Sequence, residues 1–178
     1  MKVLLEGLLP RLFPDLNFLC IAHEGKQDLR SSLTRKLRAW RDPGVRFCVI
    51  LDNDGEKCTD LKQSLVEQCA LGGRRNTLVR IVCQELEAWY LGAPDSLASA
   101  FGDEQLRGIG AKARYRSPDH IVRPSDELTR LVPEYQKLSG AMRMAQTLTR
   151  TSNSQSYRVL IEGIDHLAKS MRTPQGDK

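Results

Sequence analysis

The chain has 178 residues, with 27 lysines and arginines against 22 aspartates and glutamates, a net charge of +5. This length suffices for a domain with its own hydrophobic core, and the mild positive charge permits nucleic-acid binding without requiring it. The five cysteines form no C-x-x-C pair and no apolar run approaches the roughly 20 residues that span a bilayer, which excludes disulfide-built and membrane-spanning classes and predicts a soluble cytoplasmic protein.

The first twelve residues fit two structures. Pro10 would leave the carbonyl of Glu6 unpaired in a helix, unless the proline falls in the first turn. The alternative is a short strand over residues 2–5, with Glu6 at its carboxyl end and Gly7 in the following turn. Four leucines nevertheless follow the i, i+3, i+4, i+7 stripe of an amphipathic helix: Leu5, Leu8, Leu9 and Leu12. The sequence leaves both structures open.

Three apolar runs, at residues 17–22, 45–51 and 77–83, predict strands. Amphipathic stretches between them predict a helix from about Gln27 to Trp40 and another that ends at Gly72-Gly73. Strand, helix and strand in succession make right-handed crossovers, so the three strands should lie parallel in one sheet. The expected fold class is therefore α/β, with a mostly parallel sheet and flanking helices.

Charged side chains follow each predicted strand. Lys26 comes after the first strand, Asp52 and Asp54 after the second, and Glu85 and Glu87 after the third. The carboxyl ends of parallel strands form one edge, where ligands of such sheets collect. On extended backbone Asp52 and Asp54 would leave the same face, and close carboxylates of this kind favour a hard cation such as Mg²⁺ or Mn²⁺. These residues also have a purely structural interpretation, because aspartates cap helices and glutamates favour helix N-termini.

The second half of the chain reads as helical. Short helices are expected at 94–101 and from Ser125 to Leu131, longer ones at 135–148 and 157–171, and a long mobile loop at 102–123. Residues 172–178 are expected to form a frayed tail. We therefore predict an α/β core at 1–92 and a helical extension at 93–178 that packs on it. Trp89 and Tyr90 are expected to pack in the interior rather than stack on bases.

Several short motifs together resemble a bacterial domain-of-unknown-function family regarded as Toprim-like, related in fold to the overcoming-lysogenization-defect nucleases. The similarity runs over nearly the whole chain. The motifs are His23–Lys26, Asp52–Asp54, Gln84–Trp89, Pro133–Lys137 and Ser154–Tyr157.

The resemblance implies a Mg²⁺- or Mn²⁺-dependent nuclease or phosphoryl-transfer module with a role in nucleic-acid metabolism or anti-phage defence. Asp52 and Asp54 would hold the metal, and Glu85 or Glu87 would complete or orient the site. Lys26 would neutralise a substrate phosphate. Toprim proteins carry a catalytic glutamate at the end of a first strand, and that strand is expected to be missing here, so that Glu6 imitates the glutamate without occupying its place.

The missing strand supports a rival interpretation. Without its proton-transfer group the chain would be a non-catalytic subunit that docks on a partner ATPase or on nucleic acid. A third hypothesis is a phosphohydrolase of small nucleotides. The oligomeric state is open in all three, because a shared fold does not determine the function of its site.

Overall fold

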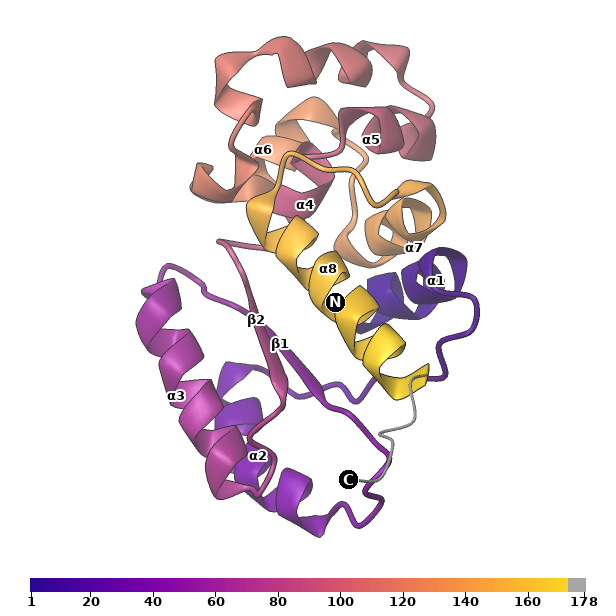
Figure 1. Cartoon of the computed structure of the whole chain (residues 1–178). Helices are drawn as coiled ribbons and strands as arrows, with labels where there is room; N and C mark the ends of the chain where they lie inside the picture. The colour runs from indigo at the N-terminus through magenta and orange to yellow at the C-terminus, as the bar shows by residue number, and fades with distance from the viewer. Residues whose placement is uncertain (173–178) are drawn as a thin grey trace.

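The computed structural model describes residues 1–172, so all but the first residue of the predicted tail at 172–178 lie outside the described residues. The described part contains two strands, eight α-helices and three short 3-10 helices (Figure 1). In chain order the elements are α1 (Lys2–Leu12), α2 (Lys26–Ala39), β1 (Cys48–Asp52), α3 (Cys58–Leu71), β2 (Leu78–Val82), α4 (Glu87–Leu91), α5 (Pro94–Phe101), η1 (Glu104–Ala111), η2 (Ala113–Tyr115), η3 (Pro118–His120), α6 (Pro124–Leu131), α7 (Lys137–Thr147) and α8 (Gln155–Arg172).

Strands β1 and β2 pair in parallel, in a register that runs from Cys48 opposite Leu78 to Asp52 opposite Val82. Their side chains alternate between two faces. Val49, Val79 and Ile81 point into one hydrophobic cluster, which contains leucines of α2 and α3. Ile50, Leu78 and Val82 belong to a larger cluster on the opposite face, where α8 crosses the sheet (Figure 1). The predicted α/β class, with a parallel sheet and a helical C-terminal half, is confirmed.

The strand predicted at residues 17–22 is wrong. Burial does alternate strictly from Leu16 to Ile21, as in a strand, with Leu19 72% and Ile21 54% exposed. However, the backbone N–H and C=O groups of residues 17–22 find no partner among the described residues. The alternating hydrophobic pattern was predicted correctly. A strand also needs hydrogen bonds to an adjacent strand, and the pattern of one segment does not show whether such a strand is present.

Strand β1 itself has one unpaired edge. Asn53 N–H donates to the Val82 carbonyl at 3.0 Å, and Leu78 N–H donates to the Phe47 carbonyl at 2.8 Å. Parallel ladders alternate, so the backbone groups of Cys48 and Ile50 point away from β2, to an edge without another strand in the described chain. The sheet at this edge is therefore narrower than the sequence predicted.

Of the two structures considered for the N-terminus, the helix is observed, with Pro10 inside it. Its leucines at 4, 5, 8 and 9 are buried, and this burial offsets the backbone hydrogen bond that Pro10 cannot donate. A Cβ added at Gly7 would lie 2.8 Å from the Cβ of Ala145, so α1 and α7 pack closely at this point. Arg11 fastens the same contact by donating to the Ala145 carbonyl at 2.7 Å.

The long loop predicted at 102–123 is instead organised as the three 3-10 helices, so that prediction is wrong. Tyr115 in this region is buried and donates to the carboxylate of Glu127, which also pairs with Arg114 at 2.7 Å and Arg130 at 2.8 Å. The buried Glu127 therefore ties the segment to α6. The sequence of this segment, rich in glycine and arginine, is typical of a loop. Its contacts with Glu127 are tertiary, so the local sequence pattern does not predict them.

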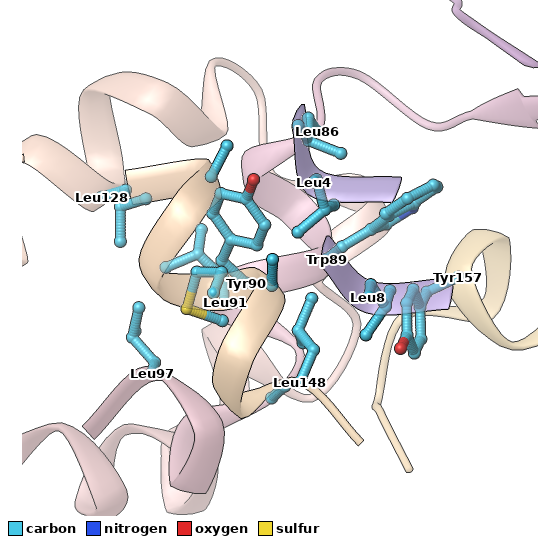
Figure 2. Packing of buried hydrophobic residues seen from close by; sticks show 14 of the residues in the cluster. Leu4, Leu8, Leu86, Trp89, Tyr90, Leu91, Leu97, Leu128, Leu148 and Tyr157 are labelled. Carbon is cyan, nitrogen blue, oxygen red and sulfur yellow. The ribbon is translucent and has the colours of Figure 1, made fainter. Parts of the chain in front are cut away.

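The larger hydrophobic cluster draws on both halves of the chain (Figure 2). Leu4 and Leu8 of α1, Trp89 and Tyr90 of α4 and Tyr157 of α8 are each at most 1% exposed. Trp89 donates to the Ser156 hydroxyl at 2.9 Å and meets Tyr157 edge to face at 5.3 Å between ring centroids. The expectation that Trp89 and Tyr90 pack in the interior is confirmed.

Candidate site at the carboxyl edge of the sheet

Asp52 ends β1, and its side chain is partly buried. Its Oδ1 is buried and has no hydrogen-bond partner among the described residues. The pKa of Asp52 is raised to about 6, chiefly by burial and then by the charge of Asp54, with smaller contributions from Glu87 and Glu85, while the N-terminal ammonium of Met1 opposes the rise. A buried carboxylate oxygen without a donor, among other carboxylates, is costly and favours a proton or a cation.

Asn53 follows and locks the ends of the two strands together. Its side chain is 5% exposed; Oδ1 accepts from Gln84 N–H at 2.5 Å and Nδ2 donates to the Glu56 carbonyl at 2.7 Å. Gln84 adopts a left-handed φ of 64°, which aims its N–H at Asn53. No sequence pattern assigned Asn53 a role of its own, although it is the residue that joins the loops after β1 and β2.

Asp54 does not continue the strand. Its φ is 46°, in the left-handed region, so the expectation that Asp52 and Asp54 leave the same face of extended backbone is wrong. Its carboxylate turns instead to Lys26 at the start of α2, with 3.2 Å between Oδ2 and Nζ. The two aspartates still interact through space, since the charge of Asp54 raises the pKa of Asp52.

Lys26 contacts several groups in the exposed part of the site. Its Nζ lies 2.9 Å from Glu56 Oε1 and donates to the Asn53 carbonyl at 3.0 Å. Burial alone would lower the pKa of Lys26, but its hydrogen bonds to Glu56 and Asp54 outweigh that effect and the pKa is raised. The side chain is only 18% exposed, so it is a fixed positive charge beside Asp54 and Glu56.

Glu85 and Glu87 approach the same place from the loop after β2, and each has a polar partner. Glu85 Oε2 accepts from Ser125 N–H at 2.8 Å, so Glu85 caps a backbone N–H at the N-terminal end of α6. Glu87 is 4% exposed and accepts from the Tyr135 hydroxyl at 2.7 Å. Both carboxylates therefore also stabilise the fold.

Two tyrosines, Tyr90 and Tyr135, complete the buried side of the site, and neither was predicted to belong to it. Tyr90 Oη is buried without a hydrogen-bond partner among the described residues. Burial, then the charges of Glu87 and Asp52, raise the pKa of Tyr90 well above its usual value. Tyr135 lies in one of the motifs quoted above, which was the only sequence signal for it.

Glu6 is placed elsewhere. It lies on α1, where it pairs with Lys2 at 3.6 Å, and it is not among the charges that act on Asp52. The structure therefore brings Asp52, Asp54, Glu85, Glu87 and Lys26 to one edge of the sheet and leaves Glu6 apart.

The donor set fits a metal only in part. Within residues 1–172 no group of three or more His, Cys, Asp or Glu side chains is arranged to hold a metal ion. Asp52 nevertheless offers a buried oxygen without a donor, which is the chemistry that a hard cation prefers. A cation here would need Asp54 or a glutamate to exchange its present partner for the metal.

Comparisons with known proteins place the chain in a family and no further. A family model described as Domain of unknown function (DUF4276) matches residues 1–158. No curated protein and no solved structure matches the chain. In residues 1–172, no helix has the length and apolar character needed to cross a membrane.

Proposed function

Because the chain belongs to the DUF4276 family, a domain of unknown function, its activity has to be inferred from its site, and we propose a Toprim-like, Mg²⁺- or Mn²⁺-dependent nuclease. The observation that supports this most directly is the buried Asp52 Oδ1 without a donor, surrounded by the charges of Asp54, Glu85 and Glu87. Oxygen ligands of this kind suit Mg²⁺ and Mn²⁺.

Each side chain has a role in this proposal. Asp52 and Asp54 hold the cation, and Glu85 and Glu87 orient them while anchored to Ser125 and Tyr135. Lys26, already beside Asp54, neutralises a phosphate of the nucleic acid. A cation bound here polarises the phosphodiester and lowers the pKa of its water.

The rival is a non-catalytic subunit that docks on a partner ATPase or on nucleic acid. It is favoured by the present engagement of Asp54 with Lys26 and of both glutamates with their own donors. It is also favoured by the position of Glu6 on α1, which leaves the edge without the glutamate that the Toprim resemblance requires.

Nicking of supercoiled plasmid DNA in Mg²⁺, in Mn²⁺ and in EDTA tests the nuclease. We expect nicking with a divalent ion and its loss in Asp52→Asn with Asp54→Asn. Asp60→Asn with Asp126→Asn is the matched control, since both aspartates are exposed surface residues.

Two further measurements separate the rivals. Wild-type protein that leaves DNA and RNA intact in both metals, but co-purifies with an ATPase from its native host, would establish the docking subunit in place of the nuclease. Turnover of free nucleotides in the absence of nucleic acid would instead identify a small-nucleotide phosphohydrolase.

A further inference from the structure

The amino ends of the two strands, opposite the carboxylates, carry a concentration of arginines. Arg41 and Arg46 lie in the connection that enters β1, Arg74 and Arg75 in the connection that enters β2, and Arg80 within β2. We call these five residues the arginine surface. Each strand has five residues, so roughly 16 Å separates the two connections from the carboxylate edge, at about 3.3 Å per residue, and Arg80 lies midway along β2.

None of these five arginines forms an ion pair with a carboxylate among the described residues, although arginines elsewhere in the chain do. Three of them are held by backbone carbonyls instead. Arg46 donates to Pro43 at 3.0 Å, Arg74 to Trp40 at 2.5 Å and Arg80 to Val159 at 2.9 Å. The positive charges are thus positioned by the fold without being neutralised.

The arginine surface borders a groove of about 890 Å³ between β2 and α8, which α8 lines from Val159 to Met171. Arg46 and Arg80 line it from the strand side, and His166 and Glu162 from α8. A smaller hollow of about 140 Å³, which shares Arg46, extends to Arg74 and Arg75. Two acidic residues belong to this region. Glu162 lines the groove, and Asp42 lies in the connection before β1, where its Oδ1 accepts from Gly44 N–H, so the five arginines outnumber these two carboxylates.

We propose that the arginine surface binds the phosphate backbone of a nucleic acid. Guanidinium groups match phosphate oxygens in a bidentate geometry, and arginines already fixed by backbone carbonyls lose little entropy on binding. Contact is independent of base sequence, because the exposed groups are charges and the nearby Phe47 ring is covered by Arg74 at 5.1 Å and by the edge of Trp40. This proposal rests on the proposed function in that the ligand is nucleic acid, which would be anchored away from the site of cleavage.

Fluorescence anisotropy with labelled single-stranded and double-stranded DNA of about 20 nucleotides, in EDTA, tests the inference. We expect micromolar binding at low salt, with log affinity falling by about 0.7 to 0.9 per phosphate contact for each tenfold rise in salt. Arg41→Glu, Arg46→Glu and Arg75→Glu together should weaken binding at least tenfold and reduce the salt slope by about two to three. The two DNA forms show which conformation of the backbone the groove accepts.

The matched control is Lys62→Glu, Lys112→Glu and Lys137→Glu, which changes the net charge equally at exposed lysines elsewhere. It should retain most of the affinity. An equal loss in the control would mean that net charge alone drives binding and would overturn the inference, as would a wild-type protein that binds neither DNA at low salt. Far-UV circular dichroism shows that each variant is folded. A milder set of variants keeps the positive charge but removes the bidentate contact: Arg41→Lys, Arg46→Lys and Arg75→Lys.

The result is separable from that of the nuclease. Binding lost in the arginine variants, together with no cleavage in Mg²⁺ or Mn²⁺, supports the surface and removes the enzyme. The opposite outcome is cleavage by the wild-type protein, with arginine variants that cleave and bind DNA as well as the wild type does. That outcome would support the nuclease and overturn the arginine surface.

Discussion

At the scale of single residues, Asn53 has a structural role that no sequence pattern indicated. Its amide joins the loop after β1 to Gln84 N–H and to the Glu56 carbonyl. The Asn53 amide is itself buried, and a buried amide is expensive to leave unpaired. The positions of Asp52, Asp54 and Glu85 therefore depend on this amide.

We expect Asn53→Ala to lower the free energy of unfolding by about 1 to 3 kcal/mol, since it removes two hydrogen bonds to partly buried backbone groups. Urea denaturation monitored by circular dichroism measures this change. Asn153→Ala is the control, because the Asn153 side chain is exposed and it contributes only its backbone N–H to the fold. A loss no larger than that of the control would show that the amide is dispensable.

At the scale of elements, the contact between α1 and α7 depends on the absence of a side chain at Gly7. An added Cβ would meet Ala145 Cβ at 2.8 Å, and both atoms are attached directly to helix backbone. The clash can be relieved only if the helices move apart.

Gly7→Ala should therefore destabilise the protein by about 1 to 3 kcal/mol, the usual cost of overpacking, even though alanine is the better helix former. Gly108→Ala is the comparison, because a Cβ there meets nothing within 4 Å. Thermal unfolding should place the melting temperature of Gly7→Ala well below that of Gly108→Ala. Equal melting temperatures would contradict the close approach of α1 and α7.

At the scale of the whole molecule, residues from both halves share one hydrophobic cluster. Leu4 and Leu8 pack in the cluster that includes Met144 and Leu148, and the Trp89 indole donates to Ser156. The sheet therefore depends on helices from the second half of the chain for one of its two covered faces.

A fragment of residues 1–92 should consequently be unfolded or molten when made alone. Its far-UV circular dichroism and its urea transition would report a loss of cooperative structure, while the full chain unfolds in a single transition. A cooperative transition in the fragment would mean that the cluster around α2 and α3 suffices for stability.

Prediction from sequence succeeded where local periodicity carries the information. The apolar runs at 45–51 and 77–83, and the helices after each acidic loop, follow from the periods of 2 and 3.6 in side-chain direction. The right-handed crossover rule then placed Lys26, Asp52, Asp54, Glu85 and Glu87 at one edge. The strand at 17–22 was predicted on the same period and was wrong, because ladder hydrogen bonds require a neighbour that no local pattern specifies.

The sequence by itself determined the α/β class, the parallel sheet and the collection of charged groups at its carboxyl edge. Tertiary structure alone decided which of those groups already have partners: Lys26 for Asp54, Ser125 for Glu85, Tyr135 for Glu87, and no donor for Asp52 Oδ1. It also decided that the arginines at the opposite edge have no carboxylate partner within residues 1–172. The physical reason is that hydrogen bonds and ion pairs form between atoms a few ångströms apart in space, and these partners lie up to 48 positions apart in the chain.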